Sequence, residues 1–188
     1  MTDPADLSLN AWAVLTLLVD DGPQHGFALS RQLARTTEIG RVWSVSRPLV
    51  YRALEQLEQR GLVTGGPEVP SPTGPSRQEF TATRKGRAAV GRWRAQPVDR
   101  LRDVRPTLIL KLTLSRRAGL DLAPLVAAQR AEFVDLLDGR HPEVGDGEAP
   151  VVDVWRAELA AAVGRTLDRL DPPTAASSSA SSRRRGRR

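Results

Sequence analysis

The chain has 188 residues, no cysteine and a formal net charge of +6 at neutral pH. This length can bury a core without crosslinks, and the lack of cysteine excludes disulfides, thiolate zinc sites and cysteine nucleophiles. The first nine residues carry acids and no basic residues, and no apolar run reaches the roughly 18 residues of a membrane span, so the sequence predicts a soluble cytoplasmic protein.

Two helices are predicted at the start of the chain. Ser8 is a suitable N-cap for a helix that runs to about Val19, and this helix is apolar nearly all round, which places it in the interior. The turn signal at residues 20–23 then precedes a short second helix that ends near Arg35, with Phe27 among its apolar markers.

A third helix is predicted from Ser46 to Gly61, with Pro48 in the first turn, where its missing N–H costs nothing. Apolar residues at helical spacing form its buried stripe: Val50, Ala53, Leu54 and Leu57. The residues left outside this stripe or at the N-terminal end are Arg47, Pro48, Tyr51, Arg52, Glu55 and Gln59. We therefore expect an exposed face whose side chains suit a DNA groove.

A hairpin and a fourth helix complete the first 96 residues. Residues 62–64 and 78–81 are β-prone and flank a stretch rich in proline and glycine, which predicts a two-stranded hairpin with a long tip. Thr83 caps a helix that runs to Trp93 and is broken at Pro97. This order predicts a mainly α, α+β fold with a winged helix-turn-helix DNA-binding domain over residues 1–96.

Residues 97–171 are predicted to form a C-terminal helical domain for dimerisation. Helices are expected over residues 106–116, 120–139 and 151–170, with a connecting loop over 139–150. The last two helices resemble an antiparallel pair with one apolar seam that neither helix could bury alone. The seam residues expected to form the dimer contact are Leu122, Leu125, Phe133, Leu136, Trp155, Leu159, Val163, Leu167 and Leu170.

The positive charge is unevenly distributed. Residues 1–96 have a net charge of +3, residues 97–182 have a net charge of −2, and residues 183–188 hold five arginines. Residues 172–188 are mainly Pro, Ala, Ser and Arg, and this composition predicts a disordered tail. Its arginines would add salt-sensitive, non-specific attraction to DNA, so the overall charge overstates the basic character of the folded part.

Three stretches in register resemble the PadR family of bacterial transcriptional regulators. They are GPQHGFAL at residues 22–29, VYRALEQLEQRGLV at residues 50–63 and FTATRKGR at residues 80–87. The resemblance, which extends over residues 7–170, implies an N-terminal winged helix and a C-terminal arm that dimerises. It also implies a regulator that usually represses until an effector or cellular signal releases it.

Carried over by position, Tyr51 matches the family's recognition-helix tyrosine, and Gly74 with Arg77 matches the wing tip. Arg52 stands where the family commonly has proline, which gives the recognition helix an added charge for phosphate or guanine. A homodimer of this kind predicts a near-palindromic operator in double-stranded DNA. The expected DNA-binding residues are Ser46, Arg47, Pro48, Tyr51, Arg52, Arg31, Arg35, Gly74 and Arg77.

Two further interpretations concern ligands and function. Some relatives bind aromatic compounds at the dimer interface, which makes Trp93 and Trp155 candidates for a small aromatic effector site, with packing as the alternative. The alternative function is a winged-helix module that docks on a protein without sequence-specific DNA binding. An enzyme is not expected, nor are a cofactor and a metal, because His25 and His141 lie in turns without a ligand or triad pattern around them.

Overall fold

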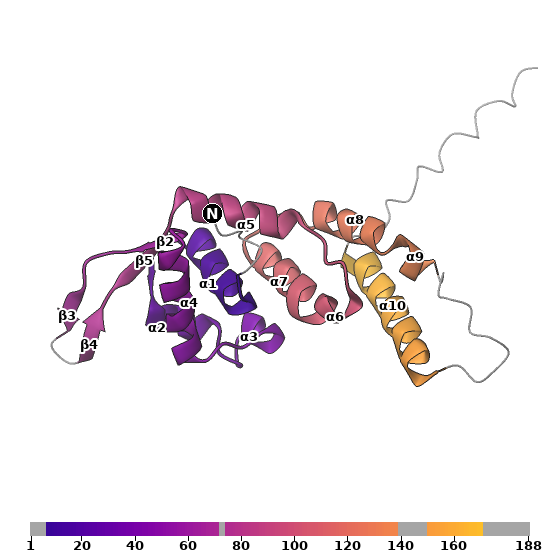
Figure 1. The fold of residues 1–188 in the computed structure, drawn as a ribbon, viewed down its shortest axis with the longest axis horizontal. Helices are drawn as coiled ribbons and strands as arrows, with labels where there is room; N and C mark the ends of the chain where they lie inside the picture. The colour runs from indigo at the N-terminus through magenta and orange to yellow at the C-terminus, as the bar shows by residue number, and fades with distance from the viewer. Residues whose placement is uncertain (1–6, 72–73, 139–149, 171–188) are drawn as a thin grey trace, which may run out of the picture.

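The computed structural model describes residues 7–71, 74–138 and 150–170 (Figure 1). In its N-terminal part the elements are α1 (Leu9–Asp20), β1 (Gln24–His25), α2 (Gly26–Gln32), α3 (Glu38–Val42), α4 (Arg47–Gln59), β2 (Val63–Gly65), β3 (Val69–Ser71), β4 (Gly74–Arg77), β5 (Glu79–Ala82) and α5 (Arg84–Ala95). The C-terminal part contains α6 (Leu101–Asp103), a π-helical turn (Val104–Leu108), α7 (Ile109–Arg117), α8 (Ala123–Glu132), α9 (Val134–Leu137) and α10 (Val151–Leu170). The predicted fold class, a winged helix followed by a helical part, is confirmed.

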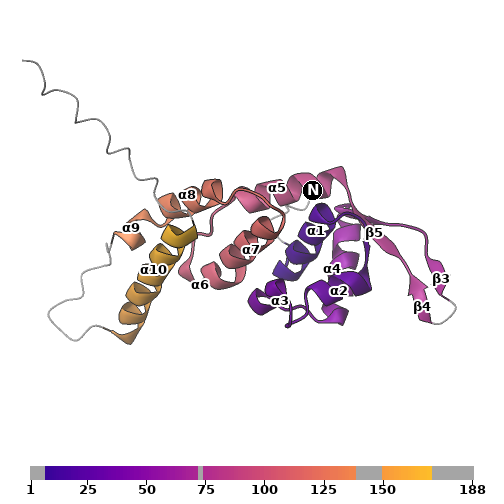
Figure 2. The same ribbon diagram turned by 180° about the vertical axis from the view of Figure 1, so that it is seen from behind.

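A small antiparallel sheet lies beside the helices of the N-terminal part. Its order is β1-β5-β2, with Gln24 opposite Phe80 and Val63 opposite Ala82. The chain between β2 and β5 forms a second pair, β3 with β4, which projects from the body of the molecule as the wing (Figures 1 and 2). The sequence predicts β2 and β5 but not β1, because a strand of two residues shows no alternation.

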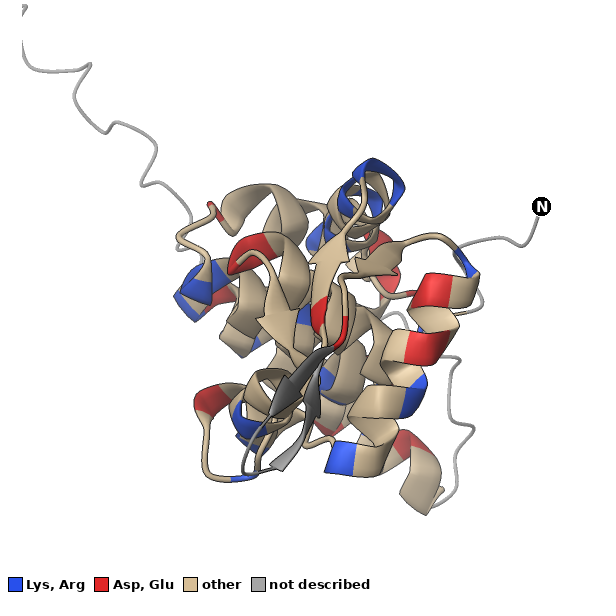
Figure 3. Ribbon diagram, turned by 90° about the vertical axis from the view of Figure 1, so that its left-hand side faces the viewer, with Lys and Arg blue, Asp and Glu red and all other residues tan. Residues whose placement is uncertain are grey.

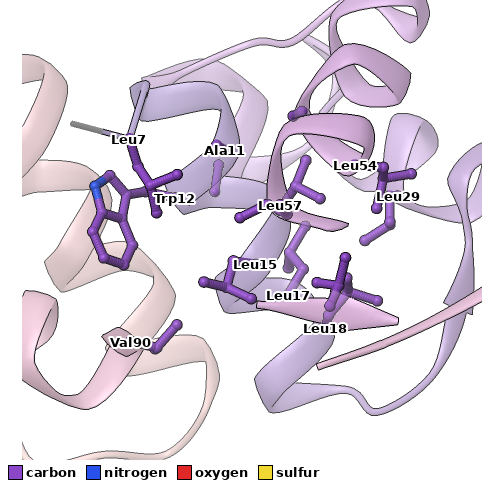
Figure 4. Close-up of a cluster of buried hydrophobic side chains, with 14 of the residues drawn as sticks. Leu7, Ala11, Trp12, Leu15, Leu17, Leu18, Leu29, Leu54, Leu57 and Val90 are labelled. Atoms are coloured by element: carbon purple, nitrogen blue, oxygen red, sulfur yellow. The ribbon is translucent and has the colours of Figure 1, made fainter. Parts of the chain in front are cut away.

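The first core surrounds α1, which is buried along most of its length and packs against α4, α5 and β5. Leucines of α1, α2 and α4 meet there, and Trp12 and Val90 close one side (Figure 4). The predicted N-caps Ser8 and Thr83 are confirmed, since the Ser8 Oγ accepts a hydrogen bond from the Ala11 N–H and the Thr83 Oγ1 accepts one from the Gly86 N–H. Ser46 holds the N-cap position of α4, but its side chain makes no cap hydrogen bond. The core therefore fixes α4 with its apolar stripe inward.

The corner between α2 and α4 contains α3, which the sequence prediction missed. The Thr37 side chain caps this five-residue helix by accepting a hydrogen bond from the Gly40 N–H at 2.9 Å. A Cβ atom at Gly40 would lie 1.8 Å from the Ala34 carbonyl oxygen, so only glycine permits this close approach of α3 to the end of α2. The Trp43 indole N–H donates to Asn10 Oδ1 at 2.9 Å and anchors the corner to α1.

Ion pairs attach α5 and α7 to the C-terminal end of α1. Arg94 of α5 pairs with Asp20, and Arg117 of α7 forms two hydrogen bonds with the Asp21 carboxylate at 2.9 and 2.7 Å. The Arg117 guanidinium lowers the pKa of Asp21 below its usual value. The Arg94 pair fastens α5 to α1 within the winged helix, and the Arg117 pair holds the C-terminal part against it.

α7 contributes to both hydrophobic cores of the molecule. Leu110 and Leu114 complete the first core, whereas Leu112, together with Leu108 just before the helix, belongs to a second core. The domain division predicted at residue 97 remains a prediction, and α7 is the element that joins the two cores.

The second core requires a correction to the predicted dimer seam. Leu125 and Phe133, with Val163 and Leu167, are buried against one another and against the segment around α6 and α7 within a single chain. Leu122, Leu136, Leu159 and Leu170 pack partly buried against this cluster. The apolar face of α10 is thus largely covered by its own chain. Of the seam residues, Trp155 is the clear exception, with 57% of its surface exposed.

Two sequence predictions lie outside the described residues: the disordered tail over 172–188 and, except for Pro150, the loop over 139–150. The predicted helix over residues 120–139 is present as α8 and α9, which meet at Phe133. In the part of the chain that the structure describes, no helix has the length and apolar character needed to cross a bilayer.

Candidate nucleic-acid interface

α4 presents the side chains that the sequence assigns to DNA. Its predicted buried stripe is confirmed, because Val50, Ala53, Leu54 and Leu57 are all buried. The predicted binding residues of this helix lie outside that stripe and are exposed: Ser46, Arg47, Pro48, Tyr51 and Arg52. Basic residues lie in the N-terminal half of the helix and acidic residues in its C-terminal half (Figure 3).

The N-terminal end of α4 carries a cluster formed by Arg47, Tyr51 and Phe27. The Arg47 guanidinium carbon lies 5.5 Å from the centre of the Phe27 ring and 5.8 Å from the centre of the Tyr51 ring. At these distances the two rings attract the cation and limit its motion. Because both rings are also exposed, Phe27 53% and Tyr51 37%, the cluster is a surface feature.

Phe27 is a functional candidate that sequence reasoning missed. Its apolar character led to its interpretation as a core marker of α2, but it lies on the outward side of that helix. A signal for the cluster was available in Gly26, directly before it. A Cβ atom at Gly26 would lie 2.9 Å from the Tyr51 ring, so the missing side chain makes room for the tyrosine.

The root of the wing is fastened by polar contacts. The Gly65 N–H donates to Glu58 Oε1 at 2.8 Å, and the Gln78 side-chain amide donates to the Gly66 carbonyl oxygen at 3.2 Å. The His25 ring nitrogen Nδ1 lies 3.0 Å from the Gln78 carbonyl oxygen and connects β1 to the same region. The His25 side chain therefore helps to join β1 to the root of the wing.

Gly74 and Arg77, the predicted wing-tip residues, are the first and last residues of β4. Gly74 pairs with Ser71 and Arg77 with Val69, so Arg77 stands at the end of β4 that is nearer β5 and the body of the molecule. Their contact with DNA stays a prediction.

Arg31 and Arg35 are exposed, and Arg31 stands four residues after Phe27 on α2, one helical turn from the α4 cluster. Arg31 lies in the last turn of α2, and Arg35 follows that helix and lines a hollow next to α3. The expectation that they hold phosphates also stays a prediction.

The two candidate effector tryptophans line separate hollows within one chain. Trp93 is buried and stacks on Trp12 with ring centres 5.1 Å apart, beside a hollow of about 550 Å³. Trp155 lines an apolar groove of about 410 Å³ between α10 and the segment around α6 and α7. A single chain therefore does not bring Trp93 and Trp155 into one site.

Lys111 is a buried cation at the Trp93 hollow that the sequence did not single out. Its ammonium group donates to the Gln96 carbonyl oxygen at 2.7 Å and lies 5.1 Å from the centre of the Trp93 ring. Burial disfavours the charged form and lowers the pKa of Lys111 to about 8.

Comparison with known proteins gives a family match and a likeness to solved structures. Residues 14–92 match the model of the transcriptional regulator PadR-like family. The chain is similar to the crystal structure of Bacillus subtilis PadR in complex with operator DNA, at 20% sequence identity and a TM-score of 0.44, over 87% of this chain and 96% of that one. No curated protein matches the sequence.

Proposed function

Because residues 14–92 match the PadR-like family of transcriptional regulators and not a family of enzymes, we propose that this chain binds DNA as a homodimeric repressor. The observation that carries the proposal is the exposed N-terminal half of α4, where Arg47, Tyr51 and Arg52 share one surface. The operator would be near-palindromic, with one half-site for each α4.

The charge pattern of α4 favours one way of docking. An α-helix fits the major groove, and in helix-turn-helix proteins its N-terminal residues contact the base edges. Arg47 and Arg52 would approach the duplex, whereas Glu55 and Glu58 on the C-terminal half would be repelled by phosphates. The helix would therefore enter the groove with its N-terminal end first.

The Arg47 cluster would add precision to this contact. A free arginine side chain loses rotamer freedom when it binds, at a cost of about 1 kcal/mol. Arg47 lies against the rings of Phe27 and Tyr51 before any DNA arrives, so part of this cost is met in the free protein. The Arg52 side chain has no such contacts within the described ranges and would lose its rotamer freedom only when DNA binds.

The test of this function uses Arg52→Ala and, as the matched control, Arg116→Ala, which removes an exposed arginine from the end of α7. Fluorescence anisotropy would measure binding to the DNA upstream of the chain's own gene and to a random duplex. A base contact at Arg52 predicts a loss of about 1 to 3 kcal/mol on the operator. The control should bind like the parent chain. An equal loss for Arg52→Ala on the operator and on the random duplex would contradict a base contact and indicate a phosphate contact.

The exposed apolar surface of α10 supports the homodimer. Val151, Val152, Val154 and Trp155 are 86%, 53%, 51% and 57% exposed, beside the groove of about 410 Å³. Contiguous apolar surface of this kind often marks a protein interface. We propose that a second copy of the chain covers it in a twofold arrangement, which would bring a second α4 to the DNA.

Sedimentation would test the dimer. Trp155→Glu should convert the dimer to a monomer, because a carboxylate would be buried without a partner. The neighbouring Arg156→Glu changes charge on the same helix at an exposed position and should leave the dimer intact. A parent chain that sediments as a monomer would refute this part of the proposal.

Release by a small aromatic effector belongs to the same proposal, with the hollow beside Trp93 as its site. Trp12 covers one face of the Trp93 ring, and both rings line the hollow. An effector bound there should change the tryptophan fluorescence and weaken operator binding at the same concentration. A compound that does only the first would not be an inducer.

The exposed apolar side chains near α4 favour one second candidate function. Phe27, Leu49 and Tyr51 are 53%, 40% and 37% exposed, and a protein partner could cover them. A gel shift at rising salt with random competitor DNA separates the two functions. A regulator retains its operator band under these conditions, whereas a protein-docking module does not form one.

A further inference from the structure

α3 approaches the segment of α6 and the π-helical turn (Figures 1 and 2). A basic hollow is lined by residues of both segments. Its volume is about 590 Å³, within the range of small-molecule sites. The residues that line it are Arg35, Gly40, Arg41, Val42, Trp43, Ser44, Arg102, Arg105 and Pro106. One wall therefore comes from the winged helix and the other from the C-terminal part.

The charge of this hollow is uncompensated. Arg35 and Arg41 contribute from one wall and Arg102 and Arg105 from the other, and no acidic residue of the described ranges lines it. None of the four guanidinium groups has an ion pair or hydrogen bond with another residue in those ranges. Four like charges around one hollow repel one another and attract a multiply charged anion.

An aromatic wall accompanies the arginines. Trp43 is half-buried and lines the hollow, and its indole N–H is held by Asn10 Oδ1 at 2.9 Å, which fixes the ring. Nucleobases stack on such rings, while guanidinium groups bind phosphate oxygens through paired hydrogen bonds. The hollow thus combines the two kinds of group that recognise a nucleotide.

We propose that this hollow binds a nucleotide carrying two or three phosphates, with the phosphates among the four arginines and the base against Trp43. The bound anion would connect the winged helix to the C-terminal part, because the arginines come in pairs from the two walls. This site goes beyond the proposed function, and its occupancy does not require that the chain bind DNA.

A duplex phosphate backbone shares part of this chemistry but uses it differently. All four arginines are exposed and could also contact a backbone. Backbone contacts need no aromatic wall, however, and Arg102 and Arg105 stand on the C-terminal part, away from the α4 cluster. The experiment therefore measures small anions and duplex DNA side by side.

Isothermal titration calorimetry on the full chain would use ATP, tripolyphosphate and adenosine without added metal. We expect one ATP per chain, weaker binding of tripolyphosphate and no binding of adenosine. The variant Arg102→Gln/Arg105→Gln should bind ATP at least tenfold more weakly. The control Arg156→Gln/Arg165→Gln removes the same charge from exposed positions of α10 and should bind ATP like the parent chain.

Three results would overturn the proposal. The first is a parent chain that does not bind ATP, and the second is an equal loss in both double variants, which would indicate general charge attraction. The third is a loss of random-duplex binding in Arg102→Gln/Arg105→Gln as large as its loss of ATP binding, which would assign the hollow to the DNA backbone. Circular dichroism melts would verify that each variant is folded.

Discussion

Gly86 offers a test of the packing of α5 against the segment that enters β2. A Cβ atom at this position would lie 2.2 Å from the Leu62 carbonyl oxygen and 3.1 Å from Leu15 Cδ1. The carbonyl cannot easily move, because it also accepts hydrogen bonds from the Thr83 N–H at 2.9 Å and from the Thr83 hydroxyl at 3.1 Å. In Gly86→Ala, α5 must therefore shift away from the segment that enters β2.

The magnitude follows from three contributions. Overpacking a well-filled site costs about 1 to 3 kcal/mol. The shift also strains the Thr83 cap, whose bond from the Gly86 N–H is 3.0 Å long, and a helix cap contributes about 1 kcal/mol. The better helix propensity of alanine stabilises α5 by about 1 kcal/mol and offsets part of this loss. The free energy of unfolding should fall by about 2 kcal/mol, the middle of the overpacking range.

Urea denaturation followed by circular dichroism would measure the change at a fixed protein concentration, which matters for a dimer. Gly91→Ala is the control, because Gly91 lies in the same helix and an added Cβ atom there would meet nothing within 4 Å. It should raise the free energy of unfolding by up to about 1 kcal/mol. Two variants that are stabilised equally would refute the close contact at Leu62.

Two further predictions concern pH. The pKa of Lys111 is lowered from 10.5 to about 8, so the unfolded chain binds a proton that the folded chain lacks between these values, and stability should rise with pH across that window. Lys111→Met should abolish this rise in denaturation series from neutral to alkaline pH. If the stability of the variant still rises with pH, another group is responsible. Arg117 lowers the pKa of Asp21 in the folded chain below the ordinary pKa of 3.8. The charged carboxylate therefore stabilises the fold above pH 3.8, and this stabilisation is lost as the pH falls through the lowered pKa. At neutral pH Asp21→Asn should lower the free energy of unfolding by up to about 1 kcal/mol, because the ion pair is partly exposed. In strong acid the variant and the parent chain should be equally stable. A stability difference that does not depend on pH would contradict the ion pair.

Much of the winged helix could be predicted because its elements carry a clear period or a clear cap. The stripe of α4 from Val50 to Leu57 follows the helical spacing, and the outward position of Arg52 follows from it. α3 and β1 could not be predicted in the same way, since five and two residues are too short to show a period. Their positions depend on tertiary contacts such as that of Gly40 with Ala34.

The candidate sites show a second limit of periodicity. An apolar stripe indicates that a helix face is covered but does not say by which partner, and the face of α8 and α10 with Phe133 and Val163 is covered by its own chain. Likewise, exposure of Arg47 could be predicted, but its position beside two rings could not. The basic hollow joins Arg35 and Arg105 across 70 positions of sequence, so only the folded chain brings them together.

The double role of α7 bears on how this molecule can be divided in the laboratory. A fragment that stops after α5 would lose Leu110 and Leu114, which are 0% exposed, and would open a water-filled trough along α1. Emptying even one buried leucine position costs about 2 to 5 kcal/mol, a large share of the stability of a small domain. A recombinant winged-helix fragment that folds by itself should therefore extend at least to Arg117, where α7 ends and the bond to Asp21 is kept.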